Sequence, residues 1–248
     1  MKHAWLILLL TLAPALAQDD FASLMKRGDQ LDAQLKTKEA LAVYLEAEKL
    51  DPKNAELLHR IAKQYGESQN DVSTKEEKRK IGMTALEYAQ RAVAADPKNS
   101  LAELALAISY GRVAPFLDSK TKIAYSKLVK EHADKARELD PKNDLIYHVL
   151  GVWNYELANL NPVLRAVAQL IYGKLPNASN EAAADNFKKA IELNPRRLAN
   201  FVELGRTYAA MDKNEEARTS LEKGIGMPNR QRDDPETKDR ARAALKKL

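Results

Sequence analysis

Residues able to do catalytic chemistry are scarce in this chain and are not arranged for it. The four histidines, His3, His59, His132 and His148, lack the spacing of a metal site. The sequence has no cysteine, which excludes disulfides, thiol nucleophiles and thiolate metal ligands. It also has no glycine-rich phosphate loop and no serine in a nucleophile elbow. We therefore predict that the protein is not an enzyme and has no catalytic residue, metal site or cofactor.

Residues able to bind a ligand are easier to find, because one set of apolar positions recurs at helical spacing. This set would form the centre of a concave groove and consists of Leu101, Leu104, Ile108, Leu145, Val152 and Val202. Four polar or aromatic residues would stand around it: Arg112, His148, Tyr155 and Arg206. An apolar centre favours an apolar occupant. Arg112 or Arg206 could bind an anionic group of the ligand. Alternatively, each could form an ion pair on the outer surface.

A repeated turn motif indicates which elements position these residues. The sequence Asp-Pro-Lys-Asn occurs at 51–54, 96–99 and 140–143, and Asn-Pro-Arg-Arg occurs at 194–197. The prolines are 45, 44 and 54 residues apart, and each separates two apolar-periodic stretches. Proline ends a helix, because it lacks an N–H and disfavours the α conformation in the residue before it. The motif therefore predicts stacked helix pairs, which form a solenoid.

Small residues would let the two helices of each pair approach closely. They stand at Gly28, Ala62, Ala107, Gly151 and Gly205. Large apolar residues three and four places away share their helix face and fill the gaps. Phe201-x2-Leu204-Gly205-x2-Tyr208 and Ala183-x3-Phe187 follow the tetratricopeptide pattern, with some residues exchanged. We predict an all-α, tetratricopeptide-repeat-like right-handed α-solenoid of about five helix pairs.

The array would occupy residues 18–233, with units at about 21–52, 55–97, 100–141, 144–195 and 198–229. Asp234 and Pro235 then begin a last helix, as N-cap and first helical residue. Arginine and lysine alternate with alanine along it. Residues 234–248 are therefore predicted to form the polar-backed C-terminal capping helix that an array needs at its end.

The fourth unit carries an inserted segment that is unusually apolar. Between Asn161 and Pro176 the only charges are Arg165 and Lys174. The apolar side chains form neighbouring helical stripes and are Val163, Leu164, Val167, Leu170, Ile171 and Leu175. A helix apolar over so much of its surface needs cover on several sides. It could fold into the groove and make it a core, or it could line, with the groove, a cavity for an apolar ligand or a partner's amphipathic helix.

The charge balance argues against a nucleic-acid partner. The 40 basic and 35 acidic residues leave a formal net charge of only +5. A nucleic-acid binder concentrates its basic residues in a patch or stripe. The densest basic run, 75–80, is broken by Glu76 and Glu77.

The N-terminus has the pattern of an export signal. Lys2 and His3 precede an uncharged apolar stretch that ends in Ala15-Leu16-Ala17. We expect residues 1–17 to be a cleaved signal peptide, which would leave a secreted or periplasmic protein that is not an integral membrane protein. The alternative is an uncleaved N-terminal membrane anchor.

One segment is more specific than a generic repeat. Leu150-Gly151-Val152-Trp153-Asn154-Tyr155-Glu156 precedes the inserted apolar helix, and Leu204-Gly205-Arg206-Thr207-Tyr208 follows it. From roughly Leu50 to its end the chain resembles the regulator of microtubule dynamics family. The resemblance implies a helical adaptor domain, and its eukaryotic members are linked to microtubules and some to lipid binding at organelle contacts. The chain lacks their acidic tract with paired phenylalanines and begins with a predicted export signal, so we expect that it is an exported bacterial relative.

Three functions follow from these observations. The first is a non-catalytic adaptor or scaffold that binds a protein or peptide partner in the groove. The second is a carrier or sensor of a lipid or other apolar ligand. The third, implied by the family resemblance, is a microtubule-associated regulator.

Overall fold

The structure is a computed structural model that describes residues 20–248, so the predicted export signal lies outside the described residues. The first helices of the five pairs are α1 (Phe21–Ala33), α3 (Ala55–Ser68), α5 (Ser100–Val113), α7 (Asp144–Ala158) and α10 (Leu198–Ala209). The second helices are α2 (Thr37–Glu48), α4 (Lys75–Ala95), α6 (Ser119–Leu139), α9 (Asn180–Leu193) and α11 (Asn214–Gly226). An inserted helix, α8 (Pro162–Tyr172), divides the fourth pair, and α12 (Asp234–Leu245) follows the fifth.

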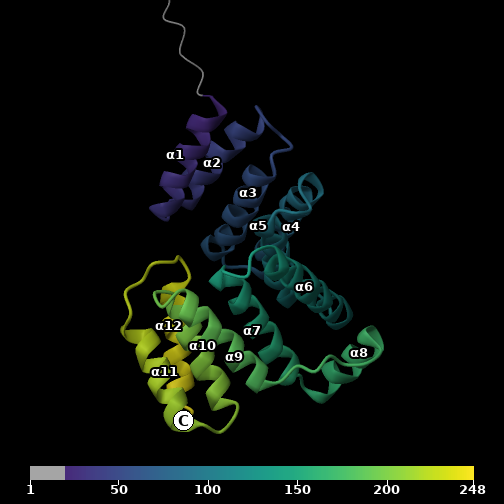
Figure 1. Ribbon diagram of the computed structural model, residues 1–248, viewed down its shortest axis with the longest axis vertical. Coiled ribbons are helices and arrows are strands. Elements are labelled where there is room, and N and C mark those ends of the chain that lie inside the picture. Colours follow the sequence, from purple (N-terminus) through teal and green to yellow (C-terminus); the bar gives the residue numbers. More distant parts are fainter. Residues whose placement is uncertain (1–19) are drawn as a thin grey trace, which may run out of the picture.

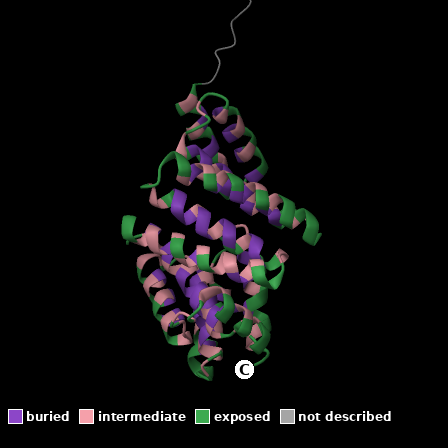
Figure 2. Cartoon of the chain, turned by 90° about the vertical axis from the view of Figure 1, so that its right-hand side faces the viewer, coloured by how far each residue is buried: buried purple, intermediate pink, exposed green. Residues whose placement is uncertain are grey.

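Successive helices pack on their neighbours along the whole array (Figure 1). Within residues 20–248 there is no strand. The buried residues lie mainly on the inner sides of the helices, while exposed residues lie on their outer sides and ends (Figure 2). These features confirm the predicted all-α solenoid of five helix pairs with an inserted helix and a capping helix.

Each turn motif both ends one helix and starts the next. At 96–99 the Asp96 carboxylate accepts a hydrogen bond from the Lys98 amide at 3.0 Å, which stabilises the turn after α4. The Asn99 side chain then accepts from the Ala102 amide at 3.0 Å and caps α5. Asn54 and Asn143 cap α3 and α7 in the same way. The repeated asparagine is therefore an N-cap, the position at which its side chain satisfies an otherwise unpaired helix amide.

Glycine permits the close approach of the two helices in a pair. A Cβ atom on Gly28 would lie 2.2 Å from Cε1 of Tyr44, and one on Gly151 would lie 2.6 Å from Cε1 of Phe187. Both rings are fully buried. The aromatic residue of the second helix thus packs directly on the backbone of the first, as the spacing predicts.

The inserted helix does not fold into the groove, and the prediction that it fills or lines the groove is wrong. α8 packs on α6, with Ala168 buried between them and the Tyr172 hydroxyl 3.3 Å from the Ser126 hydroxyl. Val163 is 71% exposed and Leu170 is 86% exposed. Leu175 lies beyond the end of the helix, which stops at Gly173 with φ +74°. The apolar sequence correctly indicates a helix but does not specify which neighbour covers it.

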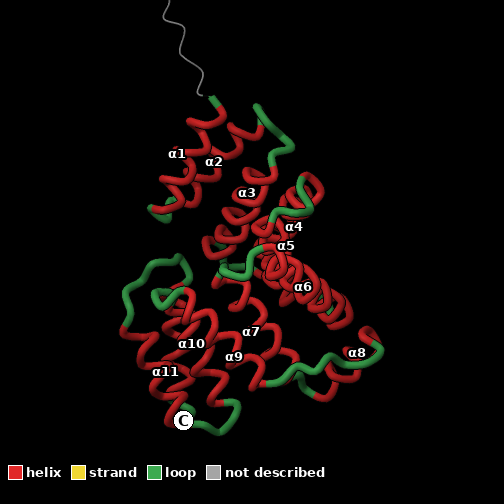
Figure 3. Tube along the Cα trace, in the orientation of Figure 1, coloured by secondary structure: helices red, strands yellow, loops and turns green. Residues whose placement is uncertain are grey.

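The C-terminal end closes the array as predicted. α12 packs on α10 and α11, and Ala241 is buried in a cluster with Leu198, Val202 and Leu221. Before α12, residues 227–233 form a loop that arches back toward the middle of the array (Figure 3). Of the helices that the structure describes, none is both long and apolar enough to cross a bilayer.

Candidate binding groove

The concave side of the array contains a cavity of about 650 Å³. Its lining comes from α3, α5 and α7, from the first half of α6, and from the loop before α12. The floor is apolar because α5 and α7 present their aliphatic side chains there, including Leu104, Ile108 and Val149. A concave apolar site with a few polar groups is the usual form of a ligand-binding pocket.

Seven of the ten residues predicted for the groove line this cavity: Leu101, Leu104, Ile108, Arg112, Leu145, His148 and Val152. The repeat frame therefore places the first-helix positions of the third and fourth units correctly. That these residues bind a ligand stays a prediction.

The other three predicted residues do not line the cavity. Val202 is fully buried in the cluster beneath α12, because the capping helix covers the fifth unit. The Arg206 guanidinium lies over the Tyr155 ring, 5.1 Å from its centroid, and forms an ion pair with Glu203 at 2.6 Å. Arg206 thus makes the alternative ion pair rather than facing the groove.

Two cations at the cavity have no carboxylate partner in the part of the chain that the structure describes. Arg112 donates one hydrogen bond from Nη1 to the Gly66 carbonyl at 2.8 Å. The side chain of Lys122, at the start of α6, makes no hydrogen bond or ion pair with any described residue, although Lys122 is half-buried. Burial without a counter-charge is costly, so both groups favour an anion that enters the cavity. Sequence reasoning missed Lys122 because it considered only first helices.

The remaining basic residues of the lining are already paired. Lys63 contacts Asp32 at 2.6 Å and Glu67 at 3.6 Å, and Arg197 contacts Asp144 at 2.5 Å. These pairs are internal to the fold. Arg112 and Lys122 are therefore the cations best placed to receive a ligand.

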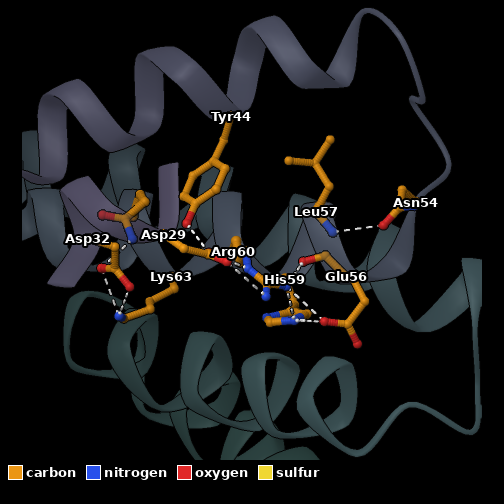
Figure 4. A network of polar contacts seen from close by, with 10 residues as sticks. Asp29, Asp32, Tyr44, Asn54, Glu56, Leu57, His59, Arg60 and Lys63 are labelled. Carbon is orange, nitrogen blue, oxygen red and sulfur yellow. Dashed lines mark hydrogen bonds and ion pairs between the residues drawn. The ribbon is translucent and has the colours of Figure 1, made fainter. Parts of the chain in front are cut away.

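A polar network between α1 and α3 forms the N-terminal end of the groove (Figure 4). Asp29 accepts hydrogen bonds from the Tyr44 hydroxyl at 2.7 Å and from Arg60 Nε at 2.8 Å. Burial raises the pKa of Glu56, but hydrogen bonds from Arg60 and His59 outweigh it and lower that pKa to about 2. The carboxylates of Asp29 and Glu56 are thus ionised and already paired with Arg60.

His148 places a neutral imidazole in the cavity wall. Its Nδ1 lies 2.8 Å from Oδ1 of the fully buried Asn200. Because an amide oxygen only accepts hydrogen bonds, Nδ1 carries the proton and donates it, and Nε2 is left as the acceptor. Burial lowers the pKa of His148, so the ring stays neutral near pH 7. It can accept a hydrogen bond from a ligand but cannot attract an anion.

The loop before α12 forms one wall of the cavity, which sequence reasoning also missed. Gln231, Arg232 and Asp233 line it. Arg232 forms an ion pair with Asp71, at the end of the short 3₁₀ helix after α3 (Gln69–Asp71). The two residues are separated by 161 positions, and nothing in the local sequence indicates the contact.

The cavity presents groups that can bind a ligand. Within residues 20–248 no group of three or more histidine, aspartate or glutamate side chains could hold a metal ion. His148 lines the cavity, but its Nδ1 is held by an amide and not by a carboxylate or a nucleophile. The site offers an apolar floor, neutral polar side chains such as His148 and Ser109, and two cations without a carboxylate partner among the described residues, Arg112 and Lys122.

Comparison with known proteins agrees with this description. The family model described as Regulator of microtubule dynamics protein 1-3 matches residues 24–248. Regulator of microtubule dynamics protein 1 of Mus musculus is 31% identical over 197 residues, which are 79% of this chain and 65% of that protein. The Caenorhabditis elegans protein of the same name is 30% identical over 172 residues, 69% of this chain and 76% of that protein. The chain thus spans just under two thirds of the length of the mouse relative.

A solved structure shares the fold. The crystal structure of a thermophilic tetratricopeptide-repeat protein from Thermus thermophilus superposes with a TM-score of 0.64. The match covers 91% of this chain and 98% of that one, with 18% sequence identity. It supports the repeat architecture alone.

Proposed function

The chain belongs to the regulator of microtubule dynamics family, and on that premise we propose that it is a non-catalytic adaptor that holds a segment of a partner protein in its groove. The observation that carries the proposal is the apolar cavity of about 650 Å³ with the unpaired cations Arg112 and Lys122. Helical-repeat arrays use such extended concave surfaces to bind other proteins.

The chemistry of the cavity suggests which segment it accepts. The aliphatic floor would take one or two large apolar side chains, which gain free energy by leaving water. Arg112 and Lys122 would take a carboxylate, either an acidic side chain or a chain terminus. A charged pair shielded from water contributes more than one on the open surface. The preferred ligand is therefore a short peptide with apolar anchors and one carboxylate.

A peptide library displayed on phage tests this preference. Peptides selected by the protein should share apolar anchors and a carboxylate. Their affinity should fall about tenfold with Arg112→Gln or Lys122→Gln, the loss of one good charge-assisted hydrogen bond. Ile108→Trp should block the cavity without adding a charge. Leu50→Glu, at a 44% exposed leucine outside the groove, is the matched control.

The proposal fails if the selected peptides bind Ile108→Trp as tightly as the unaltered protein. It also fails if their affinity is the same in the Gln variants, since the two cations would then have no part in recognition. Circular dichroism of each variant separates lost binding from lost folding.

A second candidate function is the carriage of an apolar ligand, which the size and apolar floor of the cavity favour. Native mass spectrometry of the protein purified from its own host, followed by organic extraction, tests it. A bound lipid in stoichiometric amount, absent from Ile108→Trp, would support the carrier. A bare protein mass would contradict it.

Microtubule association is a third proposal, supported only by the names of the relatives. Co-sedimentation with polymerised tubulin would test it directly. The proposed export signal conflicts with it, because an exported protein would not meet cytosolic microtubules. N-terminal sequencing of the mature protein tests export, and a chain that begins at Gln18 is the expected result.

A further inference from the structure

The inserted helix α8 carries an apolar face that no part of the described chain covers. Val163, Ala166 and Leu170 recur at i, i+3 and i+7 and so share one side of the helix. All three are exposed, and Leu170 is 86% exposed. The opposite side, with Ala168 and Tyr172, packs on α6. Figure 1 shows α8 at the right-hand edge of the molecule, beside one end of α6.

The exposed face is unusual for an outer helix of an array. Large apolar side chains on outer helices normally alternate with charged ones, and isolated exposed apolar residues need no explanation. Here the only polar side chains of α8 are those of Arg165, Gln169 and Tyr172. A helix apolar over most of its circumference, but covered on one side only, indicates a binding surface.

The charged residues beside this face are basic in both segments that form it. No acidic residue occurs between Glu156 and Glu181, while Arg165 and Lys174 do. The part of α6 that contacts Tyr172 through Ser126 adds Lys120 and Lys127, without an acidic residue from 119 to 130. Lys120 and Lys127 are exposed. The carboxylate that directly precedes α6, Asp118, is its N-cap and accepts hydrogen bonds from the Lys120 and Thr121 amides.

We propose that α8 and the adjoining half of α6 dock on an anionic lipid surface, with Val163, Ala166 and Leu170 inserted among the lipids. Peripheral proteins are held at membranes by apolar insertion and by electrostatic attraction, and an apolar helix face beside lysine and arginine provides both. The apolar side chains enter the boundary between headgroups and acyl chains, and the cations are attracted to acidic headgroups. A protein partner would need an apolar patch bordered by acidic residues. An anionic membrane provides both an apolar interior and negative charge.

The apolar face of α8 is separate from the groove, since no residue of α8 lines the cavity, whereas Lys122 and Ser126 of α6 do line it. Docking through α8 would leave the groove open to its ligand. The inference therefore does not depend on the proposed adaptor function.

Co-sedimentation with vesicles tests the inference. The protein should bind vesicles of phosphatidylcholine mixed with phosphatidylglycerol, and added salt should weaken the binding. Leu170→Asp should lower the partition coefficient at least about tenfold, since it removes one large inserted side chain and adds a repelled charge. Lys127→Glu with Lys174→Glu should lower it roughly fivefold or more for each lysine. Leu50→Asp, at a leucine that is exposed away from α8, should bind as the unaltered protein does.

Because Leu170 is exposed, we expect Leu170→Asp to fold normally, and unchanged thermal unfolding would verify this. Equal binding to vesicles by Leu170→Asp would overturn the inference. So would binding to pure phosphatidylcholine that is as strong and is insensitive to salt. If the protein ignores vesicles but forms a dimer that Leu170→Asp dissociates in sedimentation velocity, the occupant is a second copy and the lipid inference is wrong.

Discussion

Arg232 forms an ion pair with Asp71 and so joins the loop before the last helix to the second helix pair, across 161 residues of sequence. Both side chains are largely shielded from water, at 22% and 21% exposed. In an array whose units contact only their neighbours, such a contact is an exception. It gives the concave groove a wall on the side where a simple solenoid is open.

Removal of this pair should loosen the loop with little effect on the array. We expect Arg232→Gln to lower the free energy of unfolding by about 1 kcal/mol or less. Amide exchange in residues 227–233 should become faster, because the loop loses its anchor. Hydrogen exchange read by mass spectrometry checks this. Arg242→Gln, which removes an exposed pair with Asp239 within α12, is the matched control and should leave the loop unchanged.

Two glycines should respond to alanine in opposite directions. Gly151→Ala places a methyl group against the buried Phe187 ring and should destabilise the protein by about 1–3 kcal/mol. Gly111→Ala meets only Cγ2 of Val129, at an ordinary 3.8 Å, and should stabilise α5 by up to about 1 kcal/mol. Urea unfolding measures both. If Gly151→Ala were as stable as the unaltered protein, the helix pairs would have to be less tightly packed than described.

The asparagine caps should contribute separately to stability. Asn99→Ala removes the cap of α5 and should cost about 1–2 kcal/mol. Asn99→Asp keeps the capping oxygen but loses the hydrogen bond that Asn99 Nδ2 donates to Glu56 at 2.7 Å. It also sets two carboxylates side by side. The Asp variant should therefore fall between the unaltered protein and the Ala variant in chemical denaturation. If all three proteins were equally stable, the Asn99 cap would make no contribution to the stability of the turn.

Protonation of His148 should oppose folding in mild acid. Burial lowers the pKa of His148 below its ordinary value of 6.5, so the unfolded chain binds the proton more readily than the folded one. The stability contributed by the neutral ring is complete above pH 6.5 and is lost as the pH falls below it. Urea midpoints measured from pH 7.5 to 5 should fall less in His148→Gln than in the unaltered protein.

His59 must be controlled in the same experiment, since burial also lowers its pKa despite the opposing hydrogen bond with Glu56. His59→Gln should remove its own share of the pH dependence. If His148→Gln left the pH dependence unchanged, the ring would have to be accessible to water rather than buried.

The fold could be predicted because its determinants are local. A proline turn, an asparagine cap and a glycine facing an aromatic ring each lie within one helix pair, and the pairs repeat. The same regularity placed Ile108 and Val152 in the groove, since each holds a fixed position on a first helix. Periodicity also identified the inserted helix, because apolar spacing is a property of that segment alone.

The failures concern contacts between distant segments. Val202 was placed in the groove, but α12 covers that end of the array. The apolar composition of α8 predicts that another element covers it, and the groove is the nearest candidate. Composition does not specify which element that is, and in the structure it is α6. Lys122 was missed although it lies beside the apolar floor, because it belongs to a second helix whose path depends on the packing of α6.

The turns between the helix pairs stay the same while the lengths of the helices change. α4 and α6 have 21 residues each, against 12 for α2, yet the same Asp-Pro-Lys-Asn turn follows all three helices. The extra residues lie in the second helix of the pair, ahead of the turn motif that ends the pair. A unit can therefore gain surface, such as a longer second helix or the inserted α8, while a proline turn still joins it to the next unit.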